Sequence, residues 1–148
     1  MDCLEFISDI IKIEACKLKE VILPIPFTHS MTVKESAVSI AGVPVVLSLK
    51  ENTAEASCVM SQNDAGDLYK NTLSWQTDDS SPETLLQIAG LSAERMHYIV
   101  TTYGGRRKLL YNWCGFGRTV PSISQSGSDE TIAMSFSIDS RLPILTVV

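Results

Sequence analysis

The chain has 148 residues, a formal net charge of −5 and a hydrophobic content of 45%. These values are typical of one globular domain and exclude a collagenous, disordered or disulfide-dense protein. No apolar run reaches the roughly 18 residues that a membrane-spanning helix needs, so we expect no membrane association. The acidic residues Asp2, Glu5 and Asp9 near the N-terminus also disfavour a secretory signal.

The four cysteines lie far apart and form no Cys-x-x-Cys pair. Each falls in or beside an apolar stretch, where a free cysteine behaves as a small hydrophobic residue. We therefore expect free buried thiols and synthesis in a reducing, intracellular compartment.

The charge is unevenly distributed along the sequence. Residues 95–118 contain five cations and no acid, which leaves seven cations and 17 acids, or −10, for the rest of the chain. The sequence therefore predicts a molecule with two electrostatically different regions.

The first 36 residues are expected to form an N-terminal arm and a first strand. Helical and period-two spacing compete here, so a short helix or an extended arm should lead into a strand over about 10–22. Pro24 and Pro26 lack backbone donors and interrupt any ladder that follows. Period-two patterns then predict strands at 37–40 and 43–50, joined by a tight hairpin at Ala41-Gly42.

The middle of the chain predicts a second hairpin and one helix. Strands over 53–62 and 68–77 flank Asn63-Asp64-Ala65-Gly66, a composition typical of a turn. Ser81 has the chemistry of an N-cap, Pro82 suits the first helical position, and Glu83 falls in the first turn, where acid is favoured. The amphipathic pattern that follows predicts a helix over about 82–96.

Two further hairpins are expected in the last third of the chain. Gly104-Gly105 is a two-residue hairpin signal, and Gly115-Phe116-Gly117 indicates a bulge or a change of strand direction. The expected strands are 97–103 and 108–113, then 119–124 and 131–138 around a turn at Ser126-Gly127, followed by an apolar C-terminal tail over 141–148.

These elements predict a single domain over 1–148 that is mainly β, of the α+β type. We expect an antiparallel sandwich or barrel with one amphipathic helix packed on it, and a β core over 37–140.

No catalytic, metal-binding or cofactor-binding pattern is found. The two histidines, His29 and His97, are 68 positions apart, and no strand-glycine-helix phosphate cradle or Gly-x-Ser-x-Gly elbow is present. Cys114 lies near cations, but nothing identifies a base for it. We expect no enzyme activity, no metal and no cofactor, although a small enzyme or ligand-binding barrel built from dispersed residues stays open.

The hairpin over 98–116 combines basic and aromatic residues, and it is the one cluster in the sequence whose residue types suggest a binding surface. Single-stranded nucleic acid binders use such surfaces, because rings stack on bases and cations follow the backbone. Alternatively, a basic patch on an otherwise acidic chain suits head-to-tail association between subunits. The candidate residues for either role are Arg95, Tyr103, Arg106, Arg107, Lys108, Tyr111, Trp113 and Arg118.

The order of expected elements resembles the tail-tube family of long-tailed bacteriophages. The resemblance spans about 37–140 and includes Asp64-Ala65-Gly66, Ser81-Pro82-Glu83 and Gly104-Gly105-Arg106-Arg107 in their settings. It implies a tail-tube-like fold and a virion structural protein, synthesised in the host cytoplasm, that forms homo-oligomeric rings or stacks with other virion proteins. A tail-completion or connector protein is the related possibility, and nucleic acid is a secondary partner.

Overall fold

Two large β-sheets, one two-stranded sheet and one α-helix make up the regular structure of the described part of the chain. The computed structural model describes residues 2–22, 32–35, 38–63, 66–112, 115, 117–127 and 129–148. The strands are β1 (Asp2–Ile7), β2 (Ile10–Lys17), β3 (Val21–Ile22), β4 (Thr32–Val33), β5 (Ser39–Ile40), β6 (Val45–Val46), β7 (Glu55–Asn63), β8 (Gly66–Thr77), β9 (Met96–Thr102), β10 (Arg107–Leu110), β11 (Arg118–Ser126), β12 (Asp129–Ser140) and β13 (Leu145–Val147), with a 3-10 turn η1 (Leu18–Glu20) and the helix α1 (Pro82–Ala93).

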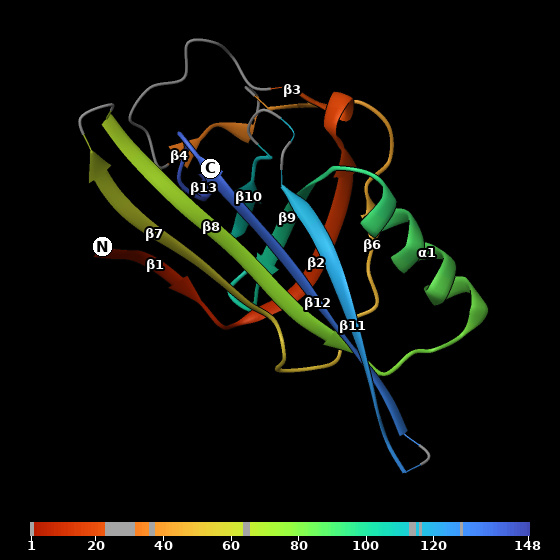
Figure 1. Cartoon of the computed structure of the whole chain (residues 1–148). Coiled ribbons are helices and arrows are strands. Elements are labelled where there is room, and N and C mark those ends of the chain that lie inside the picture. The colour runs from red at the N-terminus through yellow and green to blue at the C-terminus, as the bar shows by residue number, and fades with distance from the viewer. Residues whose placement is uncertain are drawn as a thin grey trace.

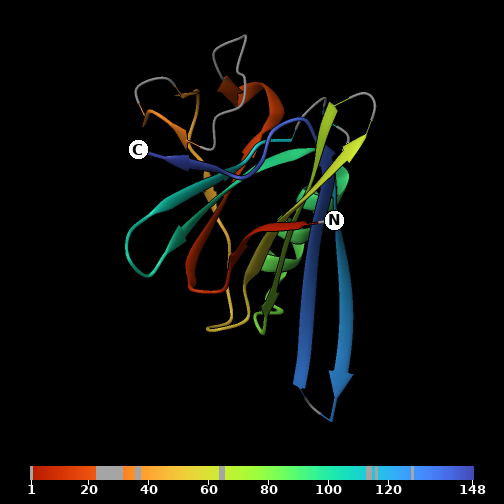
Figure 2. The ribbon, with the colours of Figure 1, turned by 90° about the vertical axis from the view of Figure 1, so that its left-hand side faces the viewer.

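The sheets form two layers. The five-stranded sheet has the order β1-β7-β8-β12-β11 and is antiparallel, while the six-stranded sheet has the order β4-β13-β10-β9-β2-β6 and contains one parallel pair, β13 with β4. Figure 1 looks onto the five-stranded sheet, and Figure 2 shows the layers from the side. The prediction of a mainly β fold with one packed helix is confirmed. The sheets do not close into a barrel, so the sandwich alternative holds.

The main core lies between the two sheets. Tyr98 of β9 is fully buried there, with its ring centroid 5.6 Å from that of Trp75 and 4.9 Å from that of Phe136. Its hydroxyl makes a hydrogen bond with Thr119 on the opposite sheet. Burial raises the pKa of Tyr98 to about 12, against the effect of that hydrogen bond, so the phenol stays neutral and holds the layers together.

A second apolar cluster covers the other face of the six-stranded sheet. It contains Ile99 and Leu109 together with Leu142 and Leu145 from the C-terminal segment. Because Tyr98 and Val100 point into the main core while Ile99 points into the second cluster, β9 is buried on both faces. This explains why its sequence is apolar at successive positions.

The helix begins as the sequence predicts and ends earlier. The Ser81 side chain accepts a hydrogen bond from the Thr84 amide, and Pro82 occupies the first turn. The backbone of Glu94 is extended, and β9 begins at Met96, so α1 stops at Ala93 and not at 96. Figure 1 shows α1 beside β11, with which it is in contact.

The expectations for the first 50 residues need the most correction. Residues 2–7 form the strand β1 and not an arm or a helix. The strand expected over 10–22 is present as β2, followed by η1 and β3. The hairpin predicted at Ala41-Gly42 is wrong: β5 pairs with β3, and β6 pairs with β2. Gly42 has a φ of +85° and Pro44 lacks a backbone donor. The chain therefore leaves the two-stranded sheet of β3 and β5 here and enters the six-stranded sheet. Of the strand expected over 43–50, only β6 forms.

The remaining hairpins are confirmed as β7-β8, β9-β10 and β11-β12. The β9-β10 turn has three residues between Thr102 and Arg106, with Gly105 at φ +83° and the Gly105 amide donating to the Thr102 carbonyl. The C-terminal tail is not peripheral, because β13 lies between β4 and β10. Pro24, Pro26 and the turn residues Asp64 and Ala65 lie outside the described residues.

Substituting Gly117 should reveal how tightly the chain is packed where it enters β11. A Cβ at Gly117 would lie 2.8 Å from the Phe136 ring and 3.0 Å from Asn112 Oδ1, so Gly117→Ala should destabilise the fold by about 1–3 kcal/mol. Gly90→Ala is the matched control: a Cβ there meets nothing within 4 Å, and in a helix alanine should stabilise by about 1 kcal/mol. Urea unfolding measures both, and equal effects would contradict the packing argument.

Candidate assembly interface

The structure divides the eight residues of the predicted basic, aromatic surface among several places. Tyr103 and Arg106 lie together in the β9-β10 turn, and both are exposed, Tyr103 to 84%. The Tyr103 amide donates to the Asp9 carbonyl at 2.8 Å, which joins this turn to the β1-β2 turn. These two side chains are therefore available at the surface.

The next two cations are already engaged. Arg107 forms an ion pair with Glu35 at 3.3 Å. Lys108 is buried, with its ammonium 2.9 Å from the Glu5 carboxylate of β1 and donating to the Thr146 hydroxyl at 2.6 Å. Since β1 and β10 belong to different sheets, Lys108 joins the two layers and is not a surface residue.

The other four predicted residues do not extend the turn into one surface. Arg95 precedes β9 and Arg118 begins β11, in the other sheet. Tyr111 is partly buried and stacks on His97, with ring centroids 4.4 Å apart. Trp113 lies outside the described residues. The hairpin therefore exposes Tyr103 and Arg106 to solvent, and the other described members lie elsewhere.

His97 and Asn112 form a buried polar junction that sequence reasoning missed. The backbone N–H of Asn112 donates to His97 Nδ1 at 2.8 Å, and His97 Nε2 contacts the Leu18 carbonyl at 2.9 Å. Because a backbone N–H only donates and a carbonyl only accepts, His97 must be neutral with its proton on Nε2. The Asn112 side chain then bonds to Met96 and to both backbone groups of Gly117, which fixes the chain between the sheets.

One end of the sandwich carries an excess of acid. Asp9 and Glu51 line the same groove, and Asp78 pairs with Lys50 at 3.4 Å and accepts from Thr131 at 3.3 Å. These contacts bring four chain segments to one end. The acidic residues of this acidic end are Asp9, Glu51, Glu55, Asp78, Asp79, Glu83 and Glu130, and its cations include Lys50 and Arg106.

Hydrogen bonds help to keep the acidic end charged. The Thr84 hydroxyl donates to Asp79 at 2.6 Å, and the Ser81 amide donates to it at 3.0 Å. These bonds lower the pKa of Asp79 below its ordinary value, with the Thr84 bond having the largest effect. Asp79 therefore stays ionised to lower pH than an isolated aspartate.

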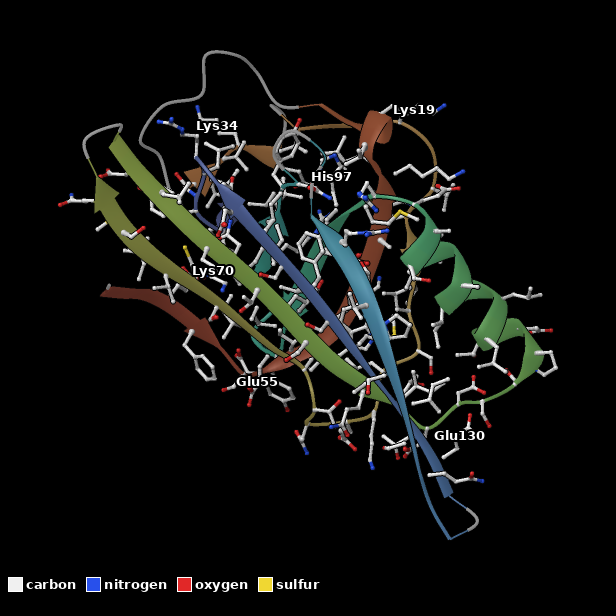
Figure 3. The ribbon with its side chains drawn as sticks, viewed as in Figure 1. Lys19, Lys34, Glu55, Lys70, His97 and Glu130 are labelled. Carbon is white, nitrogen blue, oxygen red and sulfur yellow. The ribbon has the colours of Figure 1, made fainter. Side chains whose placement is uncertain are left out.

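The opposite end carries an excess of cations. Lys17 pairs in register with Met96, beside Arg95, and Arg141 lies near the β7-β8 turn. Figure 3 shows Lys19 and Lys34 at this end and Glu55 and Glu130 at the other. The basic end comprises Lys17, Lys19, Lys34, Arg95 and Arg141, with Glu35, Asp67 and Glu94 among its nearby acids. These cations are scattered along the sequence, so a count within sequence windows does not reveal them.

Open grooves accompany these charges. One of about 410 Å³ lies beside Asp9, Glu51 and Tyr103 at the acidic end, and another of about 290 Å³ lies over the second apolar cluster. The described residues contain no group of three or more histidine, cysteine or acidic side chains placed to hold a metal ion. Within the same residues, no helix has the length and apolar content to cross a membrane.

Comparison with protein-family models, with curated proteins and with solved structures finds no match to this chain. The tail-tube resemblance therefore stays a prediction, and the geometry described above carries the functional argument.

The neutral state of His97 predicts a dependence of stability on pH. Burial lowers the pKa of His97 below 6.5, against the effect of the Leu18 hydrogen bond. The unfolded chain, with a histidine pKa of about 6.5, then binds the proton more readily, so the free energy of unfolding should fall as pH drops below about 6.5 and level off below the folded pKa. Urea unfolding between pH 5 and 8 measures this. His97→Gln should flatten the profile in that window, and an unchanged profile would contradict the assignment.

Proposed function

We propose that this protein is a non-enzymatic structural subunit that associates head to tail with copies of itself, into rings or stacks. The observation that carries the proposal is the separation of charge between the acidic end and the basic end. Opposite charges on two different surfaces favour heterologous contacts, which either close into rings or continue as filaments. Complementary surfaces of this kind also steer association and fix its register.

The sheet edges support the same proposal. β1 and β11 are the edge strands of the five-stranded sheet. β11 lies beside α1 (Figure 1), whereas Phe6 of β1 is 59% exposed. An exposed edge strand offers unpaired backbone groups to another chain, and natural monomers usually protect such edges. Pro121 gives β11 some protection, because it lacks a donor.

The resemblance in element order adds a biological setting to this proposal. A tail-tube or related tail or connector protein of a virion is a repeating, non-catalytic subunit, which agrees with a two-ended charge distribution. Nucleic acid binding is less favoured, because Lys108 and Arg107 are engaged by acids of the same chain.

Charge reversal at the two ends tests the proposal. The acidic-end variant is Glu51→Lys with Glu55→Lys, and the basic-end variant is Lys19→Glu with Lys34→Glu, all at exposed positions. Each variant alone should associate at least about tenfold more weakly than wild type, because like charges then meet. An equimolar mixture should recover association, because each reversed end then faces its complement in the other variant.

Sedimentation velocity at low salt measures this recovery. Lys70→Glu, on the outer face of the five-stranded sheet and away from both ends (Figure 3), controls for a charge reversal outside the two ends and should leave association unchanged. Mixtures that stay as weak as the single variants would overturn the head-to-tail geometry.

A further inference from the structure

The β11-β12 hairpin extends beyond the rest of the five-stranded sheet. The last residue of β8, Thr77, pairs with Ile132. Beyond that pair β12 pairs only with β11, from Ser124 opposite Thr131 to Ser126 opposite Asp129, and Ile123, opposite Ile132, lies at the base of this two-stranded part. Figures 1 and 2 both show this end of the hairpin projecting from the body of the molecule. We call residues 123–126 and 129–132 the ribbon.

The ribbon presents an apolar side chain that its own chain does not cover. Ile123 is 60% exposed, although Ile132 opposite it is fully buried. Two-stranded ribbons are marginally stable in water unless a further strand or a packed surface supports them. Glu130 lies beside Ile123 on the neighbouring strand and adds a negative charge to the ribbon.

The groove over the second apolar cluster has complementary chemistry. Its volume is about 290 Å³, and its walls include Val38, Ile99 and Leu109. This volume is about ten times the roughly 30 Å³ that one water molecule occupies in the liquid. It is therefore large enough to take a branched aliphatic side chain. The Arg107 and Glu35 ion pair lies at the same groove, and the exposed cation Lys34 is adjacent in sequence.

We propose that the ribbon of one copy docks on a second copy, with Ile123 entering the groove lined by Val38, Ile99 and Leu109. Glu130 then approaches Lys34 of the receiving copy. The ribbon belongs to the acidic end and Lys34 to the basic end, so the contact joins two different surfaces and is heterologous. This inference rests on the proposed head-to-tail association and assigns it a contact.

Paired serine substitutions on β11 test the apolar part of the contact. Ile123→Ser should raise the dissociation constant of self-association by roughly ten- to a hundredfold, the effect of losing one buried aliphatic side chain. Val120→Ser is the matched control, because Val120 is equally exposed on the same strand but pairs with Ser135 and lies on the opposite face of the sheet from Ile123. Thermal unfolding of each variant at dissociating dilution verifies that both remain folded.

A photo-crosslinking residue in place of the exposed Gln125 tests the location. Irradiation of associated protein followed by peptide mass spectrometry should recover crosslinks to residues 32–35, 38–40 or 107–109 of a second copy. If both serine variants weaken association equally, or if the crosslinks fall only in other segments, ribbon docking is overturned and head-to-tail association is not. A wild-type protein that never associates would overturn both.

Discussion

The structure depends on the burial of β9 on both of its faces. Tyr98 and Val100 complete the core between the sheets, whereas Ile99 belongs to the second apolar cluster. A strand buried twice needs cover on each side, and the five-stranded sheet supplies one cover while the C-terminal segment supplies the other. The apolar residues Leu142 and Leu145, which look like a loose tail in the sequence, are consequently structural.

The same constraint determines the chemistry of His97. At the second position of β9 its side chain is 1% exposed, and desolvation disfavours the charged imidazolium. The ring is therefore useful only as a neutral donor and acceptor, and it makes one bond in each role. Asn112 continues this network toward Gly117, so hydrogen bonds connect the end of one sheet to the beginning of β11 in the other.

Local signals predicted what local interactions determine. The helix cap at Ser81 and the hairpin around Gly105 could be predicted from the sequence, because each depends on a few neighbouring residues. The strand partners of Val45 and Val46 could not be predicted from the sequence, because the pairing there joins residues 30 and 32 positions apart. The prediction of where the helix ends was wrong for a similar reason. The start of β9 ends α1, and the tertiary partners of β9 determine where that strand starts.

The candidate surface required the same correction from sequence order to space. Alternation along β10 sends Lys108 toward Glu5 and Arg107 toward Glu35, so a run of cations does not remain a basic patch. The charges are still unevenly distributed, but between the two ends of the sandwich and not along the sequence. Loops at one end bring together acids from distant segments. No window of sequence contains this arrangement, which arises only when the sandwich forms.

Sedimentation velocity of the wild-type protein across a salt series measures the central claim most directly. If complementary ends associate, the average mass should exceed that of one chain at low ionic strength and should decrease as salt screens the charges, because the Debye length falls to about 8 Å at 0.15 M. A sedimentation coefficient equal to that of a single 16.2 kDa chain at every salt and protein concentration would contradict the account.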